Sequence, residues 1–178
     1  MKGAENFVIR NTTADDILEL RTMHGQSWRD TYENTEHGIS REWLEQRTAA
    51  WITSEGIEKS KEYFKDVFGH PDHLHQVAEN EQGDIIGLVH MSNSEQRRHL
   101  QAIYIDKRYY GTGLAQQLMD RAIAWGDTSS PIYLEVVTYN ERAKAFYRKY
   151  HFKEKPGTET FFSDIIPILT MEREGETV

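Results

Sequence analysis

Apolar residues recur at every second position over several short stretches of the chain, and this alternation predicts β-strands. Turn residues separate the stretches, most clearly at 81–84, where Gly83 and Asp84 predict a hairpin. The predicted strands cover residues 7–10, 74–79, 85–90, 100–105 and 132–137, followed by a strand that begins at Phe152 and a closing hairpin formed by 158–162 and 166–171.

Other stretches repeat their apolar residues at the three-to-four spacing of an α-helix. The first begins near Thr13, a good N-cap, and its apolar face continues through Trp28 and Tyr32. A region at 40–68 carries further helical spacing. The remaining predicted helices cover residues 114–125 and 140–150.

Length and composition exclude several classes of protein. We interpret residues 1–178 as one domain, because no linker, repeat or low-complexity tract divides them. The absence of cysteine excludes disulfides and a cysteine nucleophile, and a net charge of -8 argues against nucleic acid as a partner. The first six residues lack the apolar core of a secretory signal and no run has the length of a membrane span, so we expect a cytoplasmic protein that does not bind membranes.

Three histidines lie close together at His70, His73 and His75. No carboxylate or cysteine completes a ligand spacing around them, so we predict a polar turn and no metal site.

The stretch from Ile103 to Ala115 predicts a strand, a tight turn and the start of a helix. Gly111 and Gly113 stand at the beginning of that helix, where glycine lets a ligand come close to the backbone. The unpaired amides of a first helical turn, together with the positive end of the helix dipole, attract an anion. We therefore predict a phosphate-binding turn.

Two common nucleotide-binding motifs do not fit this turn. A Walker motif requires Gly-Lys followed by Ser or Thr, whereas Gly113 is followed by Leu114. The dinucleotide fingerprint requires a third glycine, and that position holds Gln116. The turn alone therefore leaves the identity of its ligand open.

A second motif follows in the next strand and helix. After the predicted strand at 132–137, Asn140 opens a helix that carries Ala143, Phe146 and Tyr147. With the glycine turn before it, the series Tyr-Gly-x-Gly-x-Ala and then Asn-x-x-Ala-x-x-Phe-Tyr resembles the GCN5-related N-acetyltransferase (GNAT) superfamily. The resemblance covers most of the chain and is most specific between residues 100 and 152.

The resemblance implies an α+β fold, the GNAT fold, with a mixed central sheet of about seven strands that is flanked by helices and splayed at the cofactor site. It implies acetyl-CoA as the cosubstrate, with the pyrophosphate in the glycine turn and the pantetheine between the strands at 100–105 and 132–137. The residues that it assigns to the cofactor are Ile103, Ile105, Tyr110, Gly111, Thr112, Gly113, Leu114, Ala115, Asn140 and Tyr147.

The resemblance also implies catalytic roles. The hydroxyl of Tyr147 would protonate the departing thiolate. Many relatives carry glutamate at the position of His99, and because histidine accepts a proton near neutral pH, His99 is the candidate base, with Glu135 as the alternative if it faces the cleft. The chain departs from the family pattern at Tyr110, usually Gln or Arg, and at His151, usually Gly, where a positive φ would be strained.

The acceptor is expected between the helical region and the closing hairpin, with Trp28, Tyr32, Glu33 and Glu36 as candidate substrate-binding residues. Aromatic rings there can hold an ammonium, and a carboxylate can select a cationic amine. The resulting interpretation is an acetyl-CoA-dependent N-acetyltransferase that acts on a primary amine of a small molecule, polyamine-like or another cationic amine. Acetylation of protein or peptide N-termini and a catalytically silent CoA-binding sensor are the alternatives, and a homodimer stays open.

Overall fold

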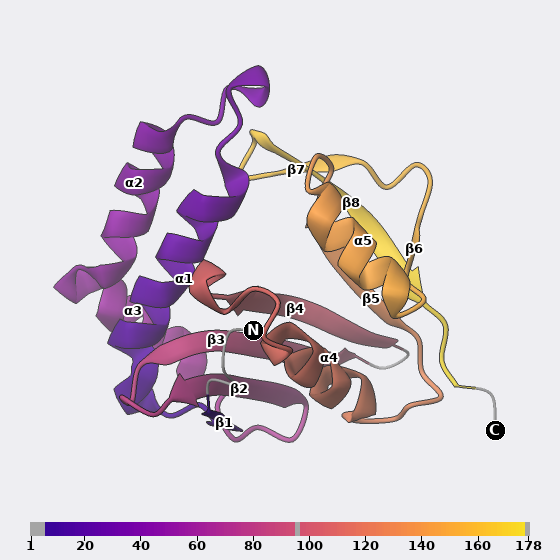
Figure 1. The fold of residues 1–178 in the computed structure, drawn as a ribbon, viewed down its shortest axis with the longest axis horizontal. Helices are drawn as coiled ribbons and strands as arrows, with labels where there is room; N and C mark the ends of the chain where they lie inside the picture. The colour runs from indigo at the N-terminus through magenta and orange to yellow at the C-terminus, as the bar shows by residue number, and fades with distance from the viewer. Residues whose placement is uncertain (1–5, 95–96, 177–178) are drawn as a thin grey trace.

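The computed structural model describes residues 6–94 and 97–176, so most of the segment considered as a secretory signal lies outside the described residues. Within them the strands form one sheet in the order β1-β2-β3-β4-β5-β8-β6, with β7 paired to β8 (Figure 1). The strands are β1 (Phe7–Asn11), β2 (His73–Asn80), β3 (Ile85–Ser94), β4 (Arg97–Ile105), β5 (Ile132–Val137), β6 (Lys153–Glu154), β7 (Thr160–Phe162) and β8 (Ile166–Arg173).

Helices cover both faces of the sheet (Figure 1). They are α1 (Ile17–Tyr32), α2 (Arg41–Ala49), α3 (Ser54–Lys65), α4 (Leu114–Ala124) and α5 (Glu141–Lys149). One core cluster joins α1 and α3 to β2 and β3 through Leu20, Phe64 and Val77. Another joins α4 to the opposite face through residues such as Leu118 and Met91. None of these helices has the length and apolar character needed to cross a bilayer, as far as the described residues are concerned.

The structure confirms the α+β fold expected from the sequence. The described residues form eight strands, slightly more than the expected number of about seven, because the short β6 and β7 both hydrogen-bond to β8. His151, which follows α5, has a φ of 67°. This is the left-handed conformation expected for a position where relatives carry glycine.

Buried histidines lie side by side on β2 and β3. His75 Nδ1 is 2.7 Å from Thr12 Oγ1, and His73 Nδ1 is 3.2 Å from His90 Nε2. Burial lowers the pKa of His75 to about 2 and that of His90 to about 4, so both rings are uncharged at neutral pH. No group of three or more His, Asp or Glu side chains in the described part of the chain is arranged to hold a metal ion.

These uncharged histidines predict a loss of stability in acid. The pKa of His90 is about 4 in the folded state against an ordinary value of 6.5, so below about pH 6.5 the unfolded chain binds more protons than the folded one. The free energy of unfolding should therefore fall as the pH is lowered from 6.5 towards 4. Denaturant titrations at several pH values would measure this slope, to which His90 contributes at most about 1.4 kcal/mol per pH unit.

The test variant is His90→Gln, which removes the buried titrating ring. His90→Gln should flatten the pH dependence relative to the wild-type protein. An unchanged slope in His90→Gln would mean that this ring carries its proton in the folded protein.

Candidate active site

β4 and β5 are parallel neighbours that pair over only two residues. Arg98 faces Ile132 and His99 faces Tyr133, and no further pair between these strands forms within the described residues. The other edge of β4 stays paired with β3, so alternate residues within 100–104 bond to β3 and the ones between them direct free backbone N–H and C=O groups towards the gap. The two parts of the sheet open away from each other here (Figure 1). A second extended group can pair with such a strand edge.

The turn between β4 and α4 is built to receive an anion. Gly111 and Gly113 have φ values of 81° and 91°, in the left-handed region that favours glycine. A Cβ on either residue would meet no heavy atom within 4 Å, so the space beside them is open. Gly113 is the N-cap of α4 and offers no side chain to the first-turn amides. Apart from the amide of Leu114, which is 3.4 Å from Thr112 Oγ1, these amides can serve a ligand.

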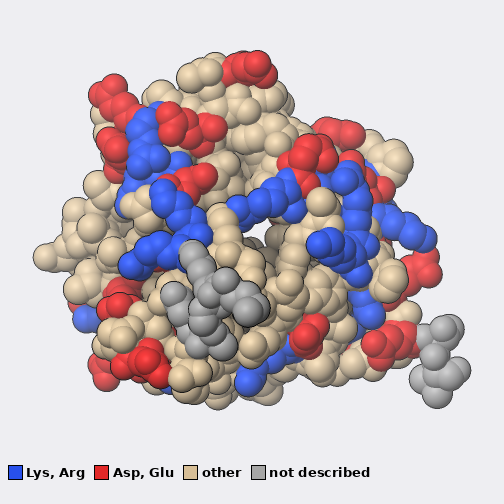
Figure 2. Space-filling model, viewed as in Figure 1, with Lys and Arg blue, Asp and Glu red and all other residues tan. Residues whose placement is uncertain are grey.

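A cavity of about 890 Å³ connects the gap between β4 and β5 with this turn. Figure 2 shows an opening at the centre of this face, between the β4–α4 turn and α5, with Lys and Arg side chains around it. The cavity continues to α1 and to the β7–β8 hairpin, which contribute Trp28 and Phe162 to its lining. One continuous space therefore joins an anion-binding turn to an aromatic end.

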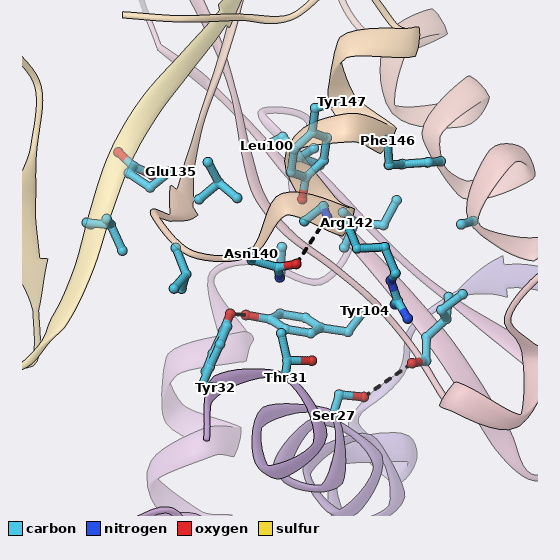
Figure 3. Close-up of a pocket in the computed structure, with 18 of the residues that line it drawn as sticks. Ser27, Thr31, Tyr32, Leu100, Tyr104, Glu135, Asn140, Arg142, Phe146 and Tyr147 are labelled. Atoms are coloured by element: carbon cyan, nitrogen blue, oxygen red, sulfur yellow. Dashed lines mark hydrogen bonds between the residues drawn. The ribbon is translucent and has the colours of Figure 1, made fainter. Parts of the chain in front are cut away.

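The start of α5 contributes two polar residues to the cavity. Asn140 is the N-cap of the helix, and its Oδ1 accepts a hydrogen bond of 3.0 Å from the amide of Ala143. This bond fixes the side chain, whose amide group lies among the lining residues (Figure 3). The guanidinium of Arg142 lies 3.5 Å from the centroid of the Tyr110 ring, a cation–π contact. A positive charge is thereby held beside the anion-binding turn.

Tyr147 projects from α5 into the middle of the cavity, with its hydroxyl directed inward (Figure 3). Burial, and to a smaller extent the neighbouring Tyr104, raises the pKa of Tyr147 well above its ordinary value. The hydroxyl therefore stays protonated over the whole physiological range and can act as a hydrogen-bond donor.

The far end of the cavity is an aromatic box formed by His24, Trp28, Tyr32, Tyr104 and Phe162. The hydroxyl oxygens of Tyr32 and Tyr104 are 2.5 Å apart. Trp28 donates a hydrogen bond of 3.0 Å from Nε1 to His24 Nε2. The Trp28 ring also contacts Phe162 edge to face, with 5.6 Å between the centroids. Two helical turns of α1 are thus joined to β4 and to the closing hairpin.

His99 and Glu135 form a pair at the edge of the cavity. His99 Nε2 is 2.7 Å from Glu135 Oε2, and the imidazole stacks on Tyr133 with 4.1 Å between ring centroids. The bond to His99 lowers the pKa of Glu135, so this carboxylate is ionised at neutral pH. Glu135 lines the cavity, whereas His99 is not among its lining residues. Of the two candidate bases, Glu135 therefore lines the cavity, and His99 contacts Glu135 without lining the cavity itself.

The structure gathers most of the predicted cofactor residues around one space. Those that line the cavity are Ile103, Ile105, Tyr110, Gly111, Ala115, Asn140 and Tyr147. Thr112 and Gly113 shape the turn, and Leu114 is buried in the core beneath it.

The predicted acceptor residues separate into two groups. Trp28 and Tyr32 line the cavity, but Glu33 and Glu36 are not among its lining residues. Both carboxylates are exposed, and Glu33 lies 3.6 Å from Arg41 in an ion pair. α1 ends at Tyr32, so both residues lie beyond the helix, in the segment that leads to α2.

Sequence reasoning missed His24, Tyr104, Arg142 and Phe162 as parts of the site. His24 stands four residues before Trp28, so helical spacing could have placed it on the same face of α1. Tyr104 lies between two predicted cofactor residues on β4 and points to the opposite face of the strand. Arg142 and Phe162 carry no comparable signal, because their positions depend on contacts between distant segments.

The comparisons with known proteins agree with this geometry. The model of the Acetyltransferase (GNAT) family matches residues 36–152. PaiA N-acetyltransferase from Thermoplasma acidophilum, solved in complex with coenzyme A, superposes with a TM-score of 0.71 at 19% identity, covering 95% of this chain and 99% of that one. A search of curated protein sequences finds no match.

Two further solved structures are similar. A spermidine N-acetyltransferase, SpeG, from Vibrio cholerae has a TM-score of 0.65 at 20% identity, covering 94% of this chain and 92% of its own. Ard1 from Thermoplasma volcanium has a TM-score of 0.63 at 20% identity, covering 96% and 99%. At these identities the superpositions establish the fold, and the family model, which spans well over half of the chain, establishes the family. The chain belongs to the GNAT family of acetyltransferases, whose acyl donor is acetyl-CoA.

Proposed function

We propose that this protein transfers an acetyl group from acetyl-CoA to a primary amine of a small molecule, by direct attack in a ternary complex. The observation that carries the proposal is the single cavity in which the anion-binding turn, the gap between β4 and β5, Tyr147 and the aromatic box meet. A donor and an acceptor can enter such a cavity from opposite ends and bring their reacting atoms together. We also propose that residues 1–178 act as one domain, since β1 and β8 belong to the same sheet.

The residues present fit acetyl-CoA. The open space beside Gly111 and Gly113 and the free amides at the start of α4 suit the pyrophosphate, with Arg142 as a nearby cation. The unpaired edge of residues 100–104 suits the amide groups of pantetheine. Binding there would bring the thioester beside Tyr147.

The chemistry needs a proton to leave the amine and another to reach the sulfur. The C–S bond of the thioester breaks, an N–C bond forms at the amine, the attacking nitrogen loses a proton and the released thiolate gains one. Tyr147 would donate the second proton, because its raised pKa keeps the hydroxyl protonated and its hydroxyl points into the cavity. Backbone N–H groups of residues 100–104 would polarise the thioester carbonyl.

Glu135 would take the proton of the amine, with His99 as its hydrogen-bond partner. Glu135 is ionised and lines the cavity, so it can hold the ammonium of the incoming substrate. Nε2 of His99 lies 2.7 Å from the Glu135 carboxylate, and the hydrogen bond between them lowers the pKa of Glu135 and fixes the orientation of its side chain. In this arrangement Glu135 contacts the substrate and His99 acts through it.

The contacts around the aromatic box favour a small acceptor over an extended peptide. Trp28 touches Phe162, and a guanidinium nitrogen of Arg47 donates a hydrogen bond of 2.7 Å to Ser163 Oγ at the tip of the β7–β8 hairpin. Tyr139 donates another, also 2.7 Å, to the carbonyl oxygen of Tyr32. These contacts join α1, α2 and the segments beside the aromatic box to one another, which supports a small acceptor. A spermidine acetyltransferase among the similar structures gives a precedent for a small amine.

Binding of CoA should depend on the free space beside Gly113. Gly113→Glu puts a carboxylate where the pyrophosphate is expected, and we predict that the Kd for CoA rises about tenfold or more, as measured by isothermal titration calorimetry. Gly83→Glu is the matched control, because Gly83 also has a positive φ of 87° and open space around it, but lies in the β2–β3 hairpin. Equal affinities in the two variants would place the anion site elsewhere.

Removing the Tyr147 hydroxyl should slow the chemical step. Tyr147→Phe is expected to lower kcat about a hundredfold with little change in CoA affinity, measured as thiol release from acetyl-CoA with an amine panel. Tyr150→Phe is the control, since that hydroxyl sits one helical turn away, contacts the Gln116 carbonyl at 3.5 Å and is not among the groups that line the cavity. If Tyr147→Phe turns over at the wild-type rate across pH, Tyr147 is not the acid.

The same assay tests the Glu135 and His99 pair. Glu135→Gln should reduce kcat/KM for amines more than His99→Gln does, because only Glu135 contacts the substrate. His99→Gln removes the partner that lowers the pKa of Glu135. The acidic limb of the pH profile should therefore move to higher pH in this variant. Loss of activity in His99→Gln alone would make the histidine the direct base.

A further inference from the structure

We propose that the acceptor of this enzyme is a primary amine with a single positive charge, carried on an aromatic or apolar body, and that polyamines are poor substrates. The inference rests on the proposed function and narrows its substrate class. It follows from the composition of the cavity at the end opposite to the anion-binding turn, where the aromatic box lies next to α1 and the β7–β8 hairpin.

Negative charge is scarce along the cavity. Among the described residues that line it, Glu135 is the only carboxylate, and the lining cations Arg142 and Lys149 both belong to α5. Glu33 and Glu36, the carboxylates that could have paired with a second ammonium, lie outside the lining. A substrate amine that is held by Glu135 therefore leaves no acidic partner for another cation.

The aromatic box itself lacks ionised groups. Burial, with a smaller contribution from Arg21, lowers the pKa of His24 to about 3, so the ring is neutral. The hydroxyls of Tyr32 and Tyr104 bond to each other, and burial raises the pKa of each. The surroundings that keep His24 uncharged would equally penalise an ammonium placed among these rings.

Arg21 also weakens the attraction of the rings for a cation. Its guanidinium lies 5.6 Å from the centroid of Trp51, and the Trp51 ring is 4.9 Å from that of Trp28 in the box. Nε of Arg21 donates a hydrogen bond of 2.8 Å to Ser60 Oγ, and no carboxylate forms an ion pair with it in the described part of the chain. A positive charge therefore lies next to Trp51, the ring that contacts Trp28 of the aromatic box.

An aromatic or apolar group avoids all of these costs. Flat rings make edge-to-face and offset contacts with Trp28, Tyr104 and Phe162, and burying their surface is favourable. A polyamine placed in the same way would bring a second ammonium into the box without a partner, and its desolvation would not be compensated. The chemistry of the transfer is the same for both substrates, so the difference lies in binding of the acceptor body.

Thiol release from acetyl-CoA with four amines tests the proposal. For 2-phenylethylamine and hexylamine we expect kcat/KM to exceed that for putrescine and spermidine by about tenfold or more, equivalent to about 1.4 kcal/mol. Turnover that is equal for the two pairs, or faster with the polyamines, overturns the inference and leaves the proposed function standing. No turnover with any of the four amines, although CoA binds, overturns the proposed function as well.

A charge placed in the cavity provides a second, independent test. Thr31 lines the cavity one residue before Tyr32, and Thr31→Asp adds a carboxylate there, whereas Thr31→Asn is the uncharged control of the same shape. We expect the ratio of kcat/KM for putrescine to kcat/KM for 2-phenylethylamine to be about tenfold higher in Thr31→Asp than in Thr31→Asn. CoA-dependent thermal stabilisation of both variants shows that they are folded. An identical ratio in the two folded variants contradicts the inference.

Discussion

The site depends on where the pairing of two parallel strands stops. Within the described residues, β4 and β5 pair only where Arg98 and His99 face β5. Beyond these two residues each strand is held by its other neighbour, β3 or β8. α4 packs against β3 and β4 and buries Leu114 and Leu118 in the core there. An unpaired strand edge inside a protein is normally a liability. Here it opens onto a cavity that a ligand with amide groups can fill.

Each part of the site is fixed by an ordinary structural device. The glycine turn takes left-handed φ values that free the first amides of α4, and Asn140 caps α5 so that Arg142 and Tyr147 project from the correct positions. The Tyr32 and Tyr104 hydroxyl pair fastens α1 to β4. Donor and acceptor ends therefore belong to different layers of the fold, and the cavity lies where these layers meet.

Sequence reasoning succeeded where the signal was local. Alternation, glycine pairs and N-caps were enough to predict the strands, the turn at Gly111 and Gly113 and the helix that carries Tyr147. It did not succeed where two distant segments decide a side chain's surroundings. The His99 contact with Glu135 depends on the register of parallel strands 36 positions apart, and the exposure of Glu33 depends on how the chain leaves α1. Neither the register nor the direction of the chain can be derived from residue spacing.

The most direct measurement is a crystal structure of this protein with CoA. If the splayed strands receive the donor, the pantetheine arm will lie between β4 and β5 and pair with the backbone of residues 100–104. The thiol sulfur will then lie within about 3.5 Å of the Tyr147 hydroxyl oxygen, a distance that allows a hydrogen bond. A pantetheine arm bound outside this gap, or a sulfur remote from Tyr147, would contradict the central claim.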